Sequence, residues 1–267
     1  MPPRVTVLTP TWNRARTFLP ETIRSVLAQT FTDFEYIIAS DGSEDDTVQV
    51  VREFMEKDDR IRLIELPRIG SIGTWTALLS AAKGKYVAWL SDDDLWNPDY
   101  LARMLTVFEH NDDAIVVYSD YSNLRNGQLV PSREARRCGL HREHLQYGCY
   151  ISLCFAVIDR RALDSMRHVL GYYFDPIGGS VCNDWVLFLN LFQAGKLKHL
   201  CDELGMIRMH DEQESVRSNV IELARRRFAV RRKYAGLSFA RALREAFTLV
   251  AWGTWNRTKK RVKTWLS

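Results

Sequence analysis

Short apolar runs alternate with helical periods over the first 120 residues of the chain. The runs are rich in β-branched or aromatic residues, as is typical of strands buried on both faces of a sheet. They fall at Val5–Leu8, Phe34–Ala39, Ile61–Leu66, Tyr86–Leu90 and Ala114–Tyr118. This alternation and spacing predict an α/β fold with a mostly parallel central sheet covered by helices.

Three helices are predicted from apolar positions three or four residues apart. These positions are Leu19, Ile23, Val26 and Leu27 in the first helix, Leu101, Met104, Leu105 and Phe108 in the second, and Trp185, Phe188, Leu189 and Phe192 in the third. Pro20 is acceptable in a first turn, whereas Asn97 and Pro98 predict the N-cap and first position of the second helix. The third helix is expected to end near Gly195. Between about residues 131 and 182 the pattern is irregular.

The net charge of +4 conceals an acidic body and a basic tail. From Glu222 onward the chain has 13 Lys and Arg against 2 Asp and Glu, whereas the remainder has a net charge of about −7. Trp252, Trp255 and Trp265 lie among these basic residues. Residues 222–267 are therefore predicted either to lie on an anionic membrane surface or to pack as helices on the preceding domain. No nucleic-acid partner is expected, because no recognition fold accompanies the charge.

The five cysteines are an odd number without a C-x-x-C pair. This pattern favours neither a zinc site nor a disulfide framework, and it predicts a reducing cytoplasm. No signal peptide precedes the first apolar run. The longest uncharged stretch near the end, Ala246–Asn256, is shorter than the roughly 18 apolar residues of a membrane span. The expected location is cytoplasmic, with peripheral binding to the inner face of the membrane if the tail contacts lipid.

An acidic triplet, Asp92 to Asp94, follows the fourth apolar run directly. Ligands of open α/β sheets bind beyond the carboxyl ends of the strands. Three adjacent carboxylates repel one another unless a cation or hydrogen-bond donors compensate, and Mg²⁺ and Mn²⁺ prefer such oxygen ligands. The triplet therefore predicts a divalent metal site. The alternative is an acidic loop that caps the helix predicted to begin at Pro98.

Two further segments follow strand-like runs. Asp41 comes after the second run, where a carboxylate can bind a nucleobase N–H or sugar hydroxyls, although Asp-Gly also favours turns. Trp12 and Arg14 follow the first run, where Trp12 can stack on a base and Arg14 can contact phosphate. Trp12 could equally pack in the core.

Two residues in the second half are candidates for chemistry. Asp184 opens the third predicted helix, so it is either a general base for an acceptor hydroxyl or an N-cap or first-turn residue of that helix. His210 follows an apolar stretch and is either a metal ligand through its neutral imidazole or a structural residue.

Together these segments resemble the family-2 glycosyltransferases of the GT-A fold, over roughly residues 4–220. The resemblance rests on the order and spacing of Thr9–Arg14, Gln29–Glu35, Ser40–Thr47, Ala82–Asp94, Val181–Asp184 and Arg208–Ser215. It implies a Rossmann-like GT-A catalytic domain over residues 1–220, with a nucleotide-sugar-binding half at about 1–120 and an acceptor-binding half at 121–220. A basic amphipathic helical tail, residues 221–267, would follow as a C-terminal extension.

The resemblance also implies roles for the matched residues. Trp12 would lie against the nucleobase, and Asp41 would bind its polar edge. Asp92 would hold the ribose. Asp93 would carry the Mn²⁺ or Mg²⁺ ion that bridges the diphosphate, and His210 would complete the metal site.

The remaining roles concern the reaction itself. Asp184 would be the catalytic base, which implies direct displacement with inversion at the anomeric carbon. Thr9, Arg14 and Asp94 complete the expected contacts with the nucleotide sugar. Asn183 stands where the family has Glu, and this difference is expected to change contacts with the acceptor.

The function implied by the resemblance is transfer of a sugar from a nucleotide-diphosphate sugar to an acceptor hydroxyl. The expected acceptor is a lipid-linked saccharide or glycolipid in cell-surface polysaccharide synthesis. Two alternatives share the nucleotide-binding sheet. One is a non-catalytic sugar-nucleotide or membrane-binding module. The other is a nucleotidyltransferase, which should have a glycine-rich loop after the first strand, but Thr9–Arg14 contains no Gly.

Overall fold

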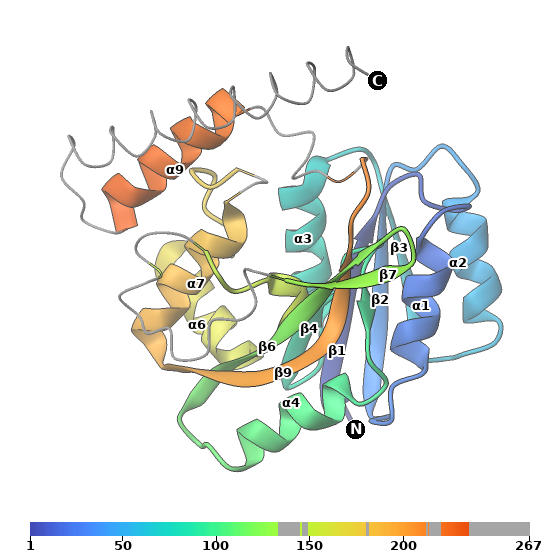
Figure 1. Ribbon diagram of the computed structural model, residues 1–267, viewed down its shortest axis with the longest axis horizontal. Coiled ribbons are helices and arrows are strands. Elements are labelled where there is room, and N and C mark those ends of the chain that lie inside the picture. Colours follow the sequence, from blue (N-terminus) through green and yellow to red (C-terminus); the bar gives the residue numbers. More distant parts are fainter. Residues whose placement is uncertain (133–144, 146–148, 180–181, 212, 214–219, 235–267) are drawn as a thin grey trace.

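The computed structural model describes residues 1–132, 145, 149–179, 182–211, 213 and 220–234 (Figure 1). A mixed sheet of nine strands lies at the centre of this described part. Its first half consists of β1 (Val5–Thr11), β2 (Phe34–Asp41), β3 (Ile61–Leu66) and β4 (Tyr86–Trp89). These strands run parallel in the order β3-β2-β1-β4. All four coincide with predicted apolar runs, so this half of the predicted sheet is confirmed.

The second half of the sheet is mixed. It continues from β4 through β8 (Ala156–Asp159), β6 (Ala114–Arg125), β9 (Lys196–Arg208) and β5 (Leu95–Trp96), and β7 (Gln128–Pro131) pairs with β6. β6 and β9 are parallel to each other, whereas β8 is antiparallel to both of its neighbours. β8 lies in the stretch whose sequence pattern is irregular. Its four residues are all buried and show no alternation of apolar and polar positions, which explains why the sequence does not predict it.

Helices cover both faces of the sheet. The core on one face includes residues of α3 (Gly70–Ala81), α6 (Arg160–Leu170) and α7 (Asn183–Ala194). The core on the other face includes residues of α1 (Leu19–Leu27), α2 (Thr47–Met55) and α4 (Tyr100–Glu109). Leu8 of β1 belongs to the first core, whereas Val7 belongs to the second. Strands that are buried on both faces in this way are the reason for the continuous apolar runs in the sequence.

The start of α4 differs from the prediction. Its N-cap is Asp99 and its first residue is Tyr100, not Asn97 and Pro98. The cause is β5, which pairs with β9 and extends the sheet up to Asn97, whose backbone N–H donates to Leu204 O at 2.9 Å. The helix therefore begins only after this strand has ended. α1 has Pro20 in its first turn, and α7 ends before Gly195, as predicted.

A helix of the basic tail lies on the described part of the fold. α9 (Val220–Tyr234) packs Leu223, Val230 and Tyr234 against the same core as α7 (Figure 1). The predicted apolar and tryptophan-bearing stretch after α9, residues 235–267, lies outside the described residues. A helix able to cross a membrane was not found in the described part of the chain.

One expectation about the cysteines is wrong. Cys201 is disulfide-bonded, although Cys149, Cys154 and Cys182 are free thiols. An odd number of cysteines does not exclude a single pair, so the count was insufficient for that interpretation. The cysteine pattern therefore no longer supports a reducing cytoplasm.

Candidate active site

The carboxyl ends of three parallel strands meet at one edge of the sheet. β1 ends at Thr11, paired with Ser40 of β2, and β4 lies on the other side of β1. The segments that follow these strands carry Trp12, Asp41 and the acidic triplet Asp92–Asp94. The end of β9 comes to the same place, because Arg208 N donates to Asp94 Oδ1 at 3.1 Å. The structure therefore brings together polar segments that are far apart in the sequence.

Asp41 fixes the loop between β3 and α3. Its buried carboxylate accepts hydrogen bonds from Ile69 N at 2.7 Å, from Gly70 N, and from Arg68 Nη1 at 2.7 Å. Gly42 allows this close approach, because a Cβ at that position would lie 2.8 Å from Arg68 N. Asp41 is thus more than a turn residue. It holds the loop that begins at the end of β3.

Trp12 lies at the surface, with 43% of its area exposed. The alternative that it packs in the core is therefore wrong. The guanidinium carbon of Arg68 lies 3.9 Å from the centre of its ring, a cation–π contact. Arg68 is a residue that the sequence analysis missed. The signal that was available is its position just after the end of β3, at the edge where ligands of parallel sheets bind.

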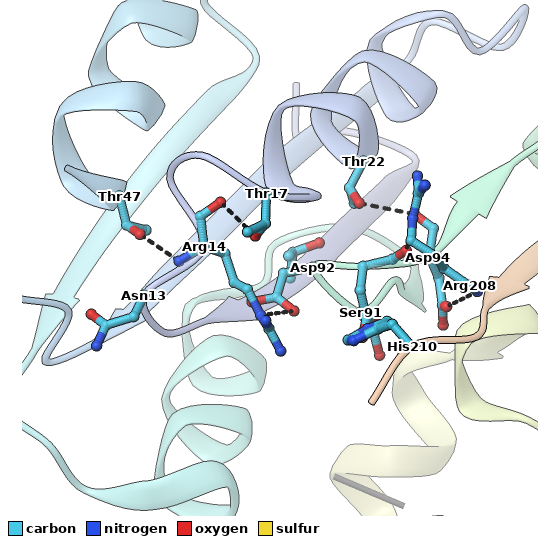
Figure 2. A network of polar contacts seen from close by, with 12 residues as sticks. Asn13, Arg14, Thr17, Thr22, Thr47, Ser91, Asp92, Asp94, Arg208 and His210 are labelled. Atoms are coloured by element: carbon cyan, nitrogen blue, oxygen red, sulfur yellow. Dashed lines mark hydrogen bonds and ion pairs between the residues drawn. The ribbon is translucent and has the colours of Figure 1, made fainter. Parts of the chain in front are cut away.

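Arg14 is held between the loop after β1 and the start of α2. Its backbone N–H donates to Thr47 Oγ1 at 2.8 Å, and its Nε lies 3.9 Å from Asp92 Oδ1 (Figure 2). Burial and the repulsion of Asp93 raise the pKa of Asp92 to about 7, against the lowering effect of Thr11 and Arg14. An additional cation nearby stabilises a carboxylate that is buried and repelled by a neighbouring carboxylate.

Asp93 and His210 form the second contact of the triplet. His210 Nε2 lies 2.9 Å from Asp93 Oδ2, and each side chain is 13% exposed. The His210 ring also packs against Phe18, with 4.5 Å between ring centres. The two residues predicted as metal ligands are therefore adjacent in space.

Asp94 has a supporting position in the triplet. Its carboxylate accepts from Arg208 N, and its backbone oxygen accepts from Thr22 Oγ1 at 2.9 Å (Figure 2). Arg208 Nε also donates to Asp93 O at 3.1 Å. These bonds tie the triplet to β9 and α1. The alternative that the triplet caps α4 is wrong, because Asp99 is the N-cap of that helix.

Thr9 lies beneath this surface. It is fully buried, and its hydroxyl donates to Leu90 O at 2.8 Å and accepts from Tyr36 Oη at 3.0 Å. Both bonds join β1 to neighbouring strands. Thr9 therefore stabilises the strand ends that carry the polar segments.

Asp184 lies in the first turn of α7, whose N-cap is Cys182. Asp184 is therefore not the N-cap, but the alternative that it is a first-turn residue of this helix is confirmed. Burial raises the pKa of Asp184 to about 6, against the lowering effects of the Trp185 backbone N–H and of Arg227. The described residues show no hydrogen bond or ion pair between Asp184 and the other predicted site residues. A carboxyl with a pKa near neutrality is suited to accept a proton from a hydroxyl.

Asn183 is the first residue of α7 and directly precedes Asp184. Its side chain is fully buried, and neither of its amide atoms has a hydrogen-bond partner among the described residues. Gly178 lies against it, because a Cβ at that position would be 2.9 Å from Asn183 Oδ1. In this conformation Asn183 lies beneath the surface at the start of α7.

The donor atoms of Asp93 and His210 fit a hard divalent cation. Mg²⁺ and Mn²⁺ are commonly bound by one or two carboxylates together with substrate phosphates, and imidazole is a further suitable ligand for transition metals. In the described part of the chain no group of three His, Cys, Asp or Glu side chains forms a complete metal site.

The sequence of this chain matches a known family. The model of Glycosyl transferase family 2 matches residues 6–166, which is more than half of the chain. The chain belongs to glycosyl transferase family 2. The resemblance inferred from the order of the sequence segments is thereby confirmed.

Several curated glycosyltransferases are similar to this family-2 chain. An uncharacterised glycosyltransferase of Nostoc, alr2836, is 29% identical over 78% of this chain and 65% of its own length. The chondroitin synthase of Pasteurella multocida is 28% identical over 81% of this chain and 22% of its own length. The chain thus spans less than two thirds of these two relatives. WfgD of Escherichia coli, a UDP-Glc:α-D-GlcNAc-diphosphoundecaprenol β-1,3-glucosyltransferase, is 27% identical over 73% of this chain and 82% of its own length.

Solved structures confirm the expected GT-A fold. Residues 1–349 of Staphylococcus aureus TarS, in complex with UDP-GlcNAc, align with a TM-score of 0.67 and 18% identity, covering 90% of this chain and 69% of that 1–349 chain. The mannosyltransferase PcManGT of Pyrobaculum calidifontis, in complex with GDP-Man and Mn²⁺, aligns with a TM-score of 0.59 and 17% identity, covering 99% and 83%. At these identities the similarity shows the fold alone.

Proposed function

We propose that this chain is an inverting, metal-dependent glycosyltransferase that moves a sugar from a nucleotide-diphosphate sugar to a hydroxyl of a lipid-linked saccharide. The observation that carries the proposal is the contact between Asp93 and His210, at 2.9 Å, beside Asp92 and Arg14. Membership of family 2 and the nucleotide-sugar complexes of proteins with the same fold support it.

The nucleobase binds at Trp12, Arg68 and Asp41. Trp12 offers an exposed aromatic face, on which a base can stack. An ionised carboxylate has about four acceptor positions, and Asp41 already receives bonds from Arg68, Ile69 and Gly70. Gly70 N is shared between the two carboxylate oxygens, at 3.2 and 3.1 Å, and an N–H from the polar edge of the base takes the place of one of these longer contacts.

The diphosphate binds at the acidic triplet. Asp92 holds the ribose, and Arg14 contacts a phosphate oxygen. Asp93 and His210 would hold the divalent ion, which when bound would neutralise charge on the leaving diphosphate. Asp94 and Thr9 keep these residues in place through the bonds that join the triplet to β9 and β1 to its neighbours.

Asp184 is the general base. Its carboxylate takes the proton of the acceptor hydroxyl while the hydroxyl oxygen attacks the anomeric carbon from the face opposite the diphosphate. The bond between the anomeric carbon and the phosphate oxygen breaks, and the nucleoside diphosphate leaves with that electron pair. One displacement of this kind inverts the anomeric configuration. Positioning of the two substrates contributes much of the rate.

The acceptor is proposed from a relative and from the basic tail. WfgD is named for transfer to a GlcNAc-diphosphoundecaprenol, which is a saccharide on a lipid diphosphate. Residues 222–267 carry the excess positive charge of the chain. We therefore place the reaction at the cytoplasmic face of a membrane, in the synthesis of a cell-surface polysaccharide.

The experiment is a screen of UDP-, GDP- and dTDP-sugars for donor hydrolysis and transfer, with MnCl₂, with MgCl₂ and with EDTA. We expect turnover of at least one donor only with metal. Asp184→Asn should bind the same nucleotide with unchanged affinity and lose transfer by about 10²- to 10⁴-fold. Full transfer activity in this variant would contradict the assignment of the base.

The alternative of a non-catalytic sugar-nucleotide or membrane-binding module predicts a different result in the same screen. Tight, metal-dependent binding without turnover of any donor would favour it. No contact among the described residues specifically supports a non-catalytic module.

A further inference from the structure

Helix α9 is strongly basic and lies against the start of α7. Its fifteen residues, Val220–Tyr234, include Glu222 and six cationic side chains. These are Arg225, Arg226, Arg227, Arg231, Arg232 and Lys233. One side of the helix packs on the domain, because Ala224 and Val230 are buried and Leu223 packs against the core. The cations on the side facing α7 are therefore held close to the domain.

The C-terminal end of α9 is anchored at Asp175. This buried carboxylate accepts hydrogen bonds from Lys233 Nζ at 2.5 Å, from Tyr172 Oη at 3.0 Å and from the Tyr234 hydroxyl. Burial acts to raise the pKa of Asp175, but these hydrogen bonds together lower it to about 2. Asp175 is therefore ionised at neutral pH, and the anchor holds.

The middle of α9 is anchored on the loop that leads into α7. Arg226 Nη1 donates to Pro176 O at 2.7 Å, and Arg226 Nε pairs with Glu222. Gly179 allows this approach, since a Cβ there would lie 3.0 Å from Arg226 Nε. α9 is thus attached at its middle and at its C-terminal end to the segment that precedes Asp184.

Between these two attachment points, cationic side chains of α9 face the first turn of α7. The guanidinium carbon of Arg231 lies 5.7 Å from the ring centre of Trp185, the neighbour of Asp184. Arg227 is one helical turn before Arg231 and therefore lies on the same face of α9. It is half-buried, and it has no hydrogen bond or ion pair with another residue in the described ranges.

The positive charge of Arg227 acts on three titratable groups near the start of α7. Burial raises the pKa of Cys149, Cys182 and Asp184, and in each case the positive charge of Arg227 acts in the opposite direction. These groups lie on two segments that meet at the start of α7. Together with its place on the face of α9 that carries Arg231, this indicates that Arg227 faces the start of α7, where Asp184 lies, without forming an ion pair with it.

We propose that α9 forms one wall of the acceptor site, and that Arg227 binds a phosphate of the acceptor next to the hydroxyl that reacts at Asp184. This inference rests on the proposed function. A planar guanidinium binds two phosphate oxygens at once and is well suited to this contact. Arg231 and Arg226 add positive potential around the same point, and both are held by contacts with the domain.

The test measures acceptor binding without turnover. Two synthetic ligands carry the same N-acetylglucosamine on a phenoxyundecyl chain, one through a diphosphate and the other through a neutral glycosidic oxygen. Binding to the full chain is followed by calorimetry without added metal, so that a metal ion cannot hold the diphosphate. We expect the diphosphate ligand to bind at least tenfold more tightly than the neutral ligand.

Variants assign this preference to a residue. Arg227→Gln should reduce the preference to less than about threefold, and Arg227→Lys should restore part of it. The matched control is Arg225→Gln, which removes an exposed cation of the same helix and should leave the preference unchanged. The proposal is overturned if the wild-type chain shows no preference, including the case in which neither ligand binds, or if Arg227→Gln keeps it.

Two further arms separate this proposal from related ones. Vesicles of phosphatidylglycerol should bind Arg227→Gln and Arg225→Gln equally. If only Arg227→Gln loses vesicle binding while the diphosphate preference persists, Arg227 binds a lipid headgroup and the proposal is wrong. Nucleotide binding and donor hydrolysis are measured alongside. If the wild-type chain neither binds a nucleotide nor hydrolyses a donor, the proposed function is wrong. The preference for the diphosphate ligand over the neutral ligand still tests the role of Arg227.

Discussion

Asp93 and His210 are 117 positions apart in the chain, and their side chains meet with Oδ2 and Nε2 2.9 Å apart. The contact depends on the return of β9 to the end of β4, where Arg208 binds the backbone of Asp93 and the carboxylate of Asp94. The metal site that we propose is therefore assembled from two strand ends. Arg14, from the loop after β1, and Asp92, beside Asp93 after β4, complete its surroundings.

Substitution of Trp12 tests the nucleobase site. Trp12→Ala removes an exposed aromatic face, and stacking of a base on such a face is worth about 1–3 kcal/mol. We expect the affinity for the nucleoside diphosphate to fall about 10- to 100-fold, as measured by calorimetry. Trp12→Phe should keep most of the affinity because it keeps a stacking face. If Trp12→Ala binds the nucleotide as the wild-type chain does, the base lies elsewhere.

The pH dependence of transfer tests the base. The pKa of Asp184 is about 6, well above the ordinary value of an aspartate, because the side chain is buried. The groups that act on its carboxyl are the Cys149 thiol, the Trp185 backbone N–H and Arg227. Below pH 6 Asp184 is protonated and cannot accept the proton of the hydroxyl.

We therefore expect kcat/KM to fall about tenfold for each pH unit below 6 and to level off above 7. The profile is measured at saturating metal, with nucleotide affinity recorded at each pH as the control. A rate that is constant between pH 5 and 7, with unchanged nucleotide affinity, would exclude Asp184 as the base.

Substitution of Asp175 tests the attachment of α9. Asp175→Asn removes the charge that holds Lys233 and weakens the bonds from Tyr172 and Tyr234. Loss of one such charge-assisted anchor costs about 1–3 kcal/mol. We expect faster trypsin cleavage within α9 at pH 7 and a lower melting temperature. Asp112→Asn, at an exposed position, is the control, and equal cleavage of both variants would show that Asp175 does not hold the helix.

The parallel half of the fold could be predicted from the sequence because its strands are buried on both faces and give uninterrupted apolar runs. β8 could not, because four buried residues between Phe155 and Arg160 have no periodic pattern. The start of α4 was misplaced since Asn97 and Pro98 have the local chemistry of a helix start, whereas the pairing of β5 with β9 is a long-range contact. Local patterns do not contain such pairings.

The site shows the same division. Asp92, Asp93 and Asp41 were found because they follow predicted strands directly. Arg68 also follows a strand, but its contact with Trp12 depends on the bend of the loop that Asp41 holds. The sequence does not distinguish Arg227 from its neighbours, because it lies in a run of three arginines. Only the packing of α9 on the domain shows that Arg227 is half-buried whereas Arg225 is exposed.

The central claim is that Asp93 carries the metal on which transfer depends. The most direct measurement is the transfer rate as a function of MnCl₂ concentration for the wild-type chain and Asp93→Asn. Asp112→Asn, at an exposed position, is the control. His210→Gln removes the second proposed ligand of the same site. We predict no metal-dependent transfer in Asp93→Asn, a need for about 10- to 100-fold more metal in His210→Gln, and a wild-type curve for Asp112→Asn. An Asp93→Asn variant with wild-type activity at the same metal concentration would contradict the account.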